Sequence, residues 1–344
     1  MTLKLTKNRK LVVALVGLPA RGKSYVSKKL CKYFNWLNIS AQIFNVGNYR
    51  RTFEGSHSGS NFFDANNSSA QQIRQKSAEA AMKDMINWLN NRDGQIAFFD
   101  ATNTTRDRRD WIKICMEKEE TDLMFLEILC NDEETINENI IKVKLLTKDY
   151  INISQECAID DFKTRIARYQ SVYEPIKSDY DRNVSFVQII NKGEQYNFNK
   201  IDSIYKNEVL IFVQSIRLTN RSIQMCVDLP KEMKEKITLA DSHYLHLETK
   251  NDNHIFISGS TEVKRNQLQI EYLETFHPFK SNFCSITLQL VPIILELESH
   301  PKLTVLCDEK ISRVLLRYFD SEFNEKDSAS KSKLLNMKYS KIKL

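Results

Sequence analysis

Short apolar runs alternate with longer stretches of helical periodicity along the first 217 residues. The apolar runs predict strands at 11–16, 42–46, 95–99, 123–129 and 184–190. Apolar residues that recur every three to four positions predict helices at about 23–36, 67–92, 105–119, 132–146, 158–174 and 200–216. Strands and helices in this alternation are typical of an α/β fold in which helices cover both faces of a parallel sheet.

The pattern changes after residue 217. An irregular polar stretch contains Pro230, and strand-like runs return at 254–258 and 302–307, with an apolar helical pattern at about 285–298 between them. We therefore predict a domain boundary near residue 218, with a first domain over 1–217 and a smaller α/β domain over 218–344. Lysines crowd the segment 331–343 and predict a solvated basic tail.

The first strand leads into a sequence of the form G-x-x-x-x-G-K-S. Its residues are Gly17, Leu18, Pro19, Ala20, Arg21, Gly22, Lys23 and Ser24, called the phosphate loop below. In such a loop the glycines let backbone N–H groups surround phosphates, Lys23 reaches the β- and γ-phosphates, and the Ser24 hydroxyl ligates Mg²⁺. A glycine turn that binds nothing is the alternative. A strand before the motif and a helix after it favour a P-loop NTPase-type sheet that binds a nucleoside triphosphate.

An acidic residue, Asp100, comes directly after the third predicted strand. A P-loop enzyme needs a carboxylate there to hold Mg²⁺ or to take a proton from the attacking hydroxyl. The alternative is that Asp100 caps a helix, because residues 100–105 are rich in capping residues. Its position after a strand favours the first role.

Arginines gather after two predicted strands of the sheet. They are Arg50, Arg51, Arg106, Arg108 and Arg109. A planar guanidinium group binds phosphate through two hydrogen bonds, so the grouping predicts a phosphorylated acceptor opposite the nucleotide. Any single arginine on a helix is more often solvated or paired, and only the grouping carries this prediction.

The composition is that of an ordinary globular chain. Its 344 residues are 42% hydrophobic and 27% charged, and the formal charge is +6. The apolar run at 11–16 is too short to span a bilayer, so we expect a cytoplasmic protein with no membrane partner. Basic residues interleaved with aromatics are lacking, and we expect no nucleic-acid partner. Seven cysteines without a C-x-x-C pair indicate neither a zinc site nor a disulfide framework.

Several segments resemble the kinase half of the 6-phosphofructo-2-kinase/fructose-2,6-bisphosphatase family. They are the phosphate loop, 44–47, 49–51, 61–63 and 99–106, followed by Arg108, Arg109, Asp161, Phe162, Arg165 and Tyr169. The similarity runs in register from about residue 10 to 217. The string at 99–106, F-D-A-T-N-T-T-R, is far more specific than the phosphate loop.

The resemblance implies transfer of the γ-phosphoryl group of MgATP to the 2-hydroxyl of fructose 6-phosphate. It implies that the phosphate loop, Cys130 and Asn139 bind ATP, that Lys144 reaches the transferring phosphate, and that Asp100 is linked to Mg²⁺ or acts as a base. The residues implied for fructose 6-phosphate are Arg50, Arg51, Arg74, Thr102, Arg108, Arg165 and Tyr169. The family also suggests a homodimer. Asn48 is a departure, because the family usually has Glu before Tyr-Arg-Arg.

In the second domain the resemblance implies that catalytic residues of the phosphatase have been replaced. The family's histidine phosphatase has Arg-His-Gly-Glu after its first strand, whereas here Gly259 and Ser260 follow the strand-like run and Asp308 replaces a second histidine. None of the six histidines lies in an R-H-G context. We therefore predict that 218–344 is a truncated phosphatase remnant without fructose-2,6-bisphosphatase activity.

Two other functions stay open at this level. One is a non-catalytic protein that binds ATP and sugar phosphate and regulates a partner, and the other is a P-loop kinase for a different phosphorylated acceptor. The intact Lys23, Ser24 and Asp100 favour an active kinase, since a decayed one is expected to lose at least one of them.

Overall fold

The chain folds into two compact units in a computed structural model. The first unit consists of Met1–Asn35 with Ile39–Gln214, and the second of Trp36–Asn38 with Ser215–Leu344. The structure describes residues 10–54, 59–141, 149–150, 153–177, 179–216, 222–227, 244–250, 254–259, 294–295, 302–307, 311–312, 314–315, 318 and 341–343. Each unit is described by itself.

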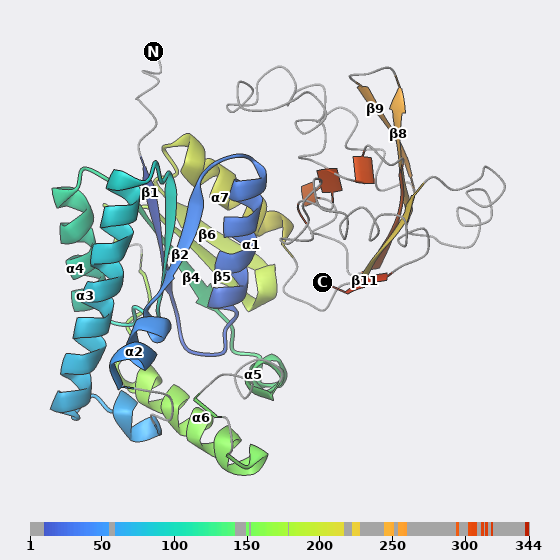
Figure 1. The fold of residues 1–344 in the computed structure, drawn as a ribbon. Coiled ribbons are helices and arrows are strands. Elements are labelled where there is room, and N and C mark those ends of the chain that lie inside the picture. Colours follow the sequence, from blue (N-terminus) through green and yellow to red (C-terminus); the bar gives the residue numbers. More distant parts are fainter. Residues whose placement is uncertain are drawn as a thin grey trace. The chain divides into compact units, whose positions relative to one another are not determined.

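The first unit is built on a six-stranded sheet (Figure 1). Its strands are β1 (Leu11–Val16), β2 (Ala41–Asn45), β3 (Ile96–Asp100), β4 (Asp122–Leu129), β5 (Phe186–Ile190) and β6 (Gln195–Asn199). The order is β2-β3-β1-β4-β5-β6, with β1 to β5 parallel and β6 antiparallel to β5. The predicted α/β fold is confirmed. The sequence did not predict β6, because its residues QYNFN are mostly polar and partly exposed.

Helices cover both faces of this sheet. They are α1 (Lys23–Trp36), α2 (Val46–Glu54), α3 (Ser68–Asn91), α4 (Arg106–Lys118), α5 (Glu133–Asn139), α6 (Gln155–Ser171) and α7 (Ile204–Ser215), with a 3-10 turn η1 at Ser60–Phe63. The sequence missed α2, whose nine residues follow β2 without a break and include only a few apolar positions. The prediction of a helix over 132–146 holds for α5, and part of that range lies outside the described residues.

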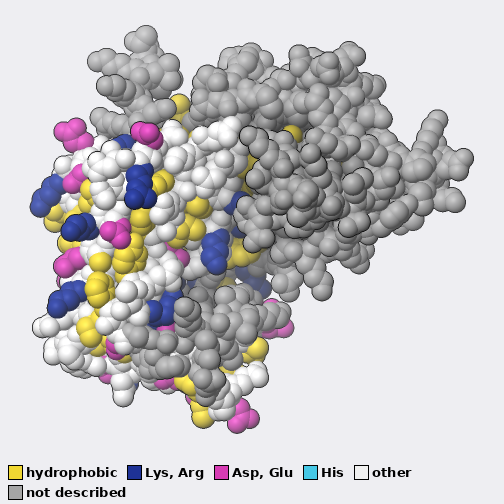
Figure 2. All heavy atoms as spheres, viewed as in Figure 1, with side chains coloured by type: hydrophobic (Ala, Val, Ile, Leu, Met, Phe, Trp, Pro, Cys, Tyr) yellow, Lys and Arg dark blue, Asp and Glu magenta, His cyan; other side chains and the backbone are white. Residues whose placement is uncertain are grey.

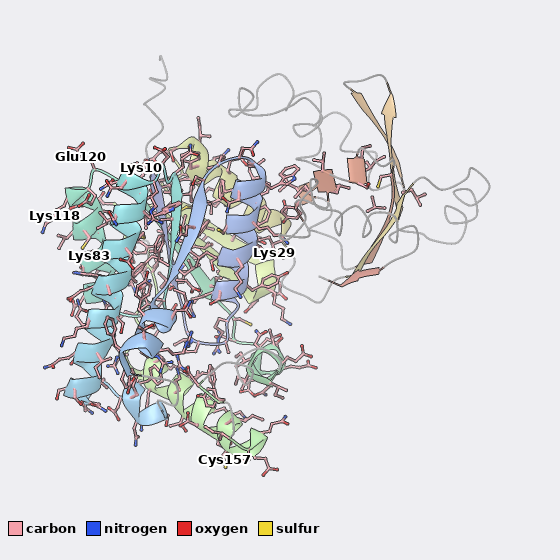
Figure 3. All side chains as sticks on the ribbon, viewed as in Figure 1. Lys10, Lys29, Lys83, Lys118, Glu120 and Cys157 are labelled. Carbon is pink, nitrogen blue, oxygen red and sulfur yellow. The ribbon has the colours of Figure 1, made fainter. Side chains whose placement is uncertain are left out.

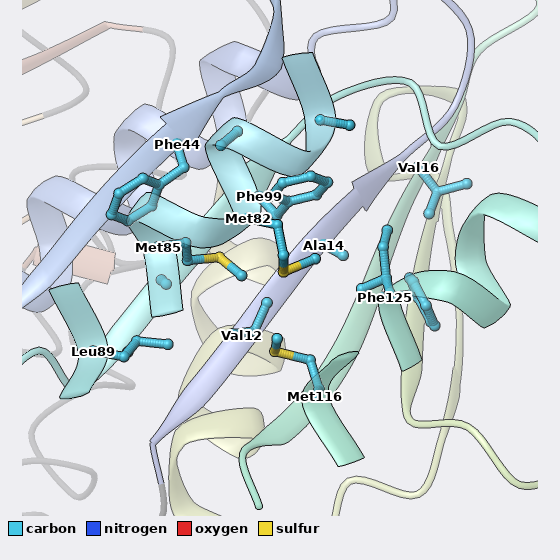
Figure 4. Packing of buried hydrophobic residues seen from close by; sticks show 14 of the residues in the cluster. Val12, Ala14, Val16, Phe44, Met82, Met85, Leu89, Phe99, Met116 and Phe125 are labelled. Atoms are coloured by element: carbon cyan, nitrogen blue, oxygen red, sulfur yellow. The ribbon is translucent and has the colours of Figure 1, made fainter. Parts of the chain in front are cut away.

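A buried apolar cluster joins one face of the sheet to α3 and α4 (Figure 4). Val12, Ala14 and Val16 of β1 point into it, together with Met82 and Met85 of α3. All six residues of β1 are buried, as expected for a central parallel strand that has helices on both sides. This packing fixes the carboxyl end of β1, from which the phosphate loop begins.

The opposite face packs against α1 and α7. The ring of Tyr33 on α1 stacks on Phe212 of α7 with centroids 4.3 Å apart, and Phe34 lies against Phe98 of β3. The Tyr33 hydroxyl donates a hydrogen bond of 3.1 Å to the carboxylate of Glu208, which is 5% exposed. A titratable group therefore lies inside the unit.

Charges of both signs are interspersed on the face of the first unit shown in Figure 2. Lys83 and Lys118 project outward from α3 and α4, and Cys157 lies exposed near the start of α6 (Figure 3). None of the helices among the described residues has the length and apolar character that crossing a bilayer requires.

The second unit contains a five-stranded sheet. Its strands are β7 (Ser222–Val227), β8 (Tyr244–Lys250), β9 (His254–Gly259), β10 (Lys302–Cys307) and β11 (Lys341–Lys343), in the order β11-β7-β10-β8-β9. The strand-like runs at 254–258 and 302–307 are confirmed as β9 and β10, whereas the stretch after 217 that looked irregular contains β7. The end of the segment predicted as a solvated basic tail forms a strand, β11, paired with β7, and the rest of that segment lies outside the described residues.

The directions of two strands in this sheet concern the positions at which the resemblance expects phosphatase residues. The strands β9 and β10 are separated by β8, and β9 runs antiparallel to β8 while β10 runs parallel to it. The chain therefore leaves the sheet in opposite directions after Gly259 and after Cys307. Ser260 and Asp308 lie outside the described residues, as does most of the helix expected at 285–298.

Candidate active site

The phosphate loop has a backbone that only glycine can follow at its first position. Gly17 has φ +129°, and a Cβ added there would lie 2.6 Å from the carbonyl oxygen of Ile128 on β4. Gly22 has φ +89° and Ala20 φ +59°. Positive φ values are costly for residues with a Cβ, so the two glycines are required by the turn itself.

The side chains of the loop fold back onto it. Lys23, 8% exposed at the start of α1, donates a hydrogen bond from Nζ to the carbonyl of Leu18 over 2.6 Å. Asn139 of α5 donates to the carbonyl of Ala20 over 3.0 Å. Cys130, buried directly after β4, interacts electrostatically with Arg21, whose pKa is lowered by burial and raised by the thiol. The two residues predicted to lie by the nucleotide, Asn139 and Cys130, are therefore beside the loop.

The acidic residue at the end of β3 is not a helix cap. The N-cap of α4 is Thr105, whose side chain accepts a hydrogen bond from the backbone N–H of Arg108. Asp100 is 4% exposed, and it accepts a hydrogen bond of 2.6 Å from Nδ2 of Asn45 at the end of β2. Because the parallel strands β2, β3 and β1 are neighbours, their carboxyl ends bring Asp100 to the same edge as the phosphate loop.

The segment after β3 is tied to the phosphate loop. The N–H of Gly17 donates to the carbonyl of Thr102 over 2.9 Å, and Asn103 donates to the carbonyl of Leu15 over 2.7 Å. Arg109, 3% exposed, donates to the carbonyls of Asn103 and Thr104. Arg109 thus braces this segment. The sequence grouped it with the phosphate-binding arginines; its Nη1 makes these supporting contacts, and its Nη2 is buried without a hydrogen-bond partner among the described residues.

Three of the predicted sugar-phosphate residues share one carboxylate. Oδ2 of Asp149 lies 2.6 Å from Nη2 of Arg50, 3.4 Å from Nη1 of Arg51 and 3.7 Å from Nη1 of Arg165. Asp149 and Arg50 are each 4% exposed. Burial lowers the pKa of the Arg51 guanidinium, Asp149 raises it, and Arg50 and Arg165 lower it. Arg50, Arg51 and Arg165 with Asp149 are called the arginine cluster below.

Two phenylalanines of η1 lie beneath these arginines. The guanidinium of Arg165 is 3.7 Å from the ring centroid of Phe63, and that of Arg50 is 5.5 Å from it. Arg74 of α3 lies over Phe62 at 5.7 Å, and the ring of Tyr169 is 5.6 Å from Phe63. The pair Phe62 and Phe63 therefore connects Arg74 and Tyr169 with the arginine cluster.

Arg108 belongs to the same neighbourhood. Burial lowers its pKa, Tyr169 and Glu79 raise it, and the charge of Arg74 lowers it. Within the part of the chain that the structure describes, five arginine nitrogens are buried without a hydrogen-bond partner: Nη1 of Arg50, Nε of Arg106, Nη1 of Arg108, Nη2 of Arg109 and Nε of Arg165. Buried unpaired donors are costly, and anions with several oxygens are their typical partners.

One apolar cluster joins the arginine cluster to the phosphate loop. Ala20 of the loop packs in the same buried group as Tyr150 and Phe162. Tyr150 follows Asp149 directly, and Phe162 lies one turn before Arg165 on α6. The two groups of predicted ligands are thus held by shared packing at one end of the sheet.

Comparison with known families shows to which family the chain belongs. The family described as 6-phosphofructo-2-kinase matches residues 1–220. The chain belongs to the 6-phosphofructo-2-kinase family. Membership covers the whole first unit, including every residue of the site described above.

Relatives named 6-phosphofructo-2-kinase/fructose-2,6-bisphosphatase match most of the chain. The relative from Aquarana catesbeiana is 32% identical, and the match covers 91% of this chain and 78% of that protein. Form 1 from Rattus norvegicus is 31% identical over the same shares, and form 3 from Homo sapiens is 30% identical over 92% of this chain and 71% of its own length.

Solved structures also resemble the chain, at low identity. A putative kinase from Chloroflexus aurantiacus has a TM-score of 0.38 at 10% identity, covering 62% of this chain and all of that one. An APS kinase from Mycobacterium tuberculosis has a TM-score of 0.35 at 12% identity, covering 59% and 94%.

Asp149 is the site residue that sequence reasoning missed. It stands in the polar stretch T-K-D-Y, where no periodicity or motif distinguishes a buried ligand from a surface acid. Asn45 lies within the segment 44–47 that carries the family resemblance, but the resemblance implied no role for it. Lys144, implied to reach the transferring phosphate, lies outside the described residues.

Proposed function

We propose that this chain transfers the γ-phosphoryl group of ATP to the 2-hydroxyl of fructose 6-phosphate, giving fructose 2,6-bisphosphate. The observation that carries the proposal is the shared packing of the phosphate loop and the arginine cluster, with Asp100 at the same edge of the sheet. A nucleotide site beside a buried basic site fits a kinase whose acceptor is itself phosphorylated.

The proposed nucleotide site consists of the phosphate loop with Cys130 and Asn139. Lys23 would leave the carbonyl of Leu18 and turn to the β- and γ-phosphates, where its charge is most useful as the phosphoryl group transfers. Lys144 stays a prediction from the family resemblance. The helix α1 begins at Lys23, so its N-terminal N–H groups would also be available to the phosphates.

The proposed Mg²⁺ ligands are Ser24 and Asp100. A hydroxyl and a carboxylate oxygen are the hard ligands that Mg²⁺ prefers, and the hydrogen bond from Asn45 fixes the carboxylate in one orientation. When bound, Mg²⁺ neutralises charge on the phosphates. Asp100 is also the carboxylate that could accept the proton of the attacking hydroxyl.

The proposed sugar-phosphate site consists of Arg50, Arg51, Arg165, Arg74, Arg108, Thr102 and Tyr169. Phosphoryl transfer requires little covalent help from protein, so the main contribution of this site is to hold the 2-hydroxyl in line with the γ-phosphate. The buried unpaired N–H groups of Arg50, Arg108 and Arg165 support the binding of an anion there.

The test is an assay of ATP with fructose 6-phosphate on the full chain, with the product identified by its phosphorylated carbon. We expect fructose 2,6-bisphosphate. A product phosphorylated at carbon 1 would contradict the proposal. Binding of ATP and sugar phosphate without turnover would favour the non-catalytic regulator, and equal binding of unrelated sugar phosphates would favour a kinase for another acceptor.

A hydrolysis assay with fructose 2,6-bisphosphate on the same preparation tests the second domain. We propose that it lacks phosphatase activity, because Gly259, Ser260 and Asp308 stand where the resemblance expects arginine and two histidines. Release of inorganic phosphate at carbon 2 would overturn this.

A further inference from the structure

We propose that Asp149 is a positioning residue of the sugar-phosphate site, which holds Arg50, Arg51 and Arg165 so that their remaining N–H groups receive one phosphate dianion. This inference rests on the proposed function. Its basis is one carboxylate oxygen that lies 2.6 to 3.7 Å from a nitrogen of each of the three guanidinium groups, with Asp149 4% exposed.

The charges of the cluster suit a dianion. Three guanidinium groups and one carboxylate leave a formal charge of +2, with Arg50 and Asp149 buried and Arg51 and Arg165 partly buried. A phosphate monoester carries about −1.5 to −2 at neutral pH. Without Asp149 the three like charges would repel one another at short range, and the side chains would separate unless a ligand were bound. The carboxylate therefore holds the three guanidinium groups close together.

Contacts with Phe63 help to orient the N–H groups of Arg165 and Arg50 that do not bond Asp149. Arg165 is held by Asp149 at Nη1 and by the ring of Phe63 on its face, while its Nε is buried and unpartnered within the described residues. Arg50 likewise bonds Asp149 through Nη2, lies over Phe63, and keeps a buried Nη1. With a carboxylate at one end and a ring at the face, Nη1 of Arg50 and Nε of Arg165 are left as buried donors for phosphate oxygens.

Asn48 is a neutral residue that contacts the arginine cluster through Arg51. Its Oδ1 accepts a hydrogen bond of 2.6 Å from Nη2 of Arg51. Because the amide is neutral, it orients Arg51 without cancelling its charge, and the formal charge of the cluster stays at +2. The substitution Asn48→Asp would lower that charge by one, whereas Asp149→Asn would raise it by one.

These opposite changes define the experiment. Initial rates of the full chain are measured against fructose 6-phosphate and against ATP at several KCl concentrations. Asp149→Asn is expected to raise the KM for fructose 6-phosphate about tenfold or more, because the donors lose their fixed geometry, while the KM for ATP changes less than about twofold. The dependence of the sugar KM on KCl becomes steeper, because the site gains a positive charge.

Asn48→Asp provides the matched variant of opposite sign. We expect a sugar KM raised about two- to threefold, since Asn48 is exposed, and a shallower dependence on KCl. Asp202→Asn is the control, because Asp202 also pairs with a basic group, Lys206, but lies on the α7 side of the unit. It is expected to leave both KM values and the salt dependence unchanged.

Several results would overturn the inference. They are a sugar KM for Asp149→Asn within twofold of the wild type, a parallel rise of both KM values, or an unchanged salt dependence. If Asp149→Asn does not fold, Asp149→Glu keeps the charge and displaces it by one methylene; an unchanged sugar KM would then contradict the inference. Failure of the wild type to bind or phosphorylate fructose 6-phosphate would instead reject the proposed function.

Discussion

Asn45 at the end of β2 donates a hydrogen bond of 2.6 Å from Nδ2 to Oδ2 of Asp100 at the end of β3. The two residues are register partners in neighbouring parallel strands, so the sheet itself sets their separation. A carboxylate held in this way can bind a cation or accept a proton without first being oriented.

The first prediction follows from that hydrogen bond. Asn45→Ala removes the donor and leaves the buried carboxylate less well oriented, so kcat should fall about tenfold while the KM for ATP changes little. Steady-state kinetics would measure this, with the exposed Asn90→Ala as control. A kcat equal to that of the wild type would mean that Asp100 needs no orientation by Asn45.

Lys23 gives the second prediction. Lys23→Ala should lower kcat by about two orders of magnitude or more, because it removes the charge that stabilises the transferring phosphoryl group. The circular dichroism spectrum should be retained, since the hydrogen bond from Lys23 to Leu18 spans only the loop. Lys29→Ala, on the same helix, removes an ammonium that lies over the ring of Tyr25 and should keep full activity.

Arg165 gives the third prediction. Arg165→Ala removes a guanidinium that stacks on Phe63 and lies beside Asp149, and it should raise the sugar KM about tenfold or more with a smaller change in the KM for ATP. Arg182→Ala, on an exposed residue, serves as control. If the affinity for ATP collapsed instead, the assignment of Arg165 to the sugar site would be wrong.

Glu208 gives a prediction about pH and stability. Burial raises the pKa of its carboxyl from 4.5 to about 7, although the Tyr33 hydroxyl donates to it and lowers the pKa. As pH rises between these two values, the Glu208 carboxyl loses its proton in the unfolded chain before it does so in the native state. The unfolded state then binds fewer protons than the native state, and the free energy of unfolding falls as pH rises from about 4.5 to 7.

The comparison with Glu208→Gln isolates this contribution. The variant should lack that part of the pH dependence and be more stable than the wild type at about pH 8, by on the order of 3 kcal/mol at most. Urea unfolding of both proteins at about pH 5 and about pH 8 measures the difference. An equal slope with pH in the two proteins would show that Glu208 does not titrate in this range.

Much of the first unit could be predicted from local patterns. The apolar run of β1 and the glycines of the phosphate loop are short-range signals, because strand burial and positive φ act within a few residues. The strand β6 and the helix α2 escaped prediction because their residues are largely polar and their stability comes from pairing with β5 and packing on α3.

Residue types at fixed spacing were enough to establish the nucleotide loop, the arginines and the family resemblance. How these parts combine depended on the folded chain. Asp149 joins Arg50 to Arg165 across 115 residues of chain, the N-cap role goes to Thr105 and leaves Asp100 at the sheet edge, and Arg109 braces a loop. A shared counter-charge depends on distances between residues remote in sequence, which no local pattern encodes.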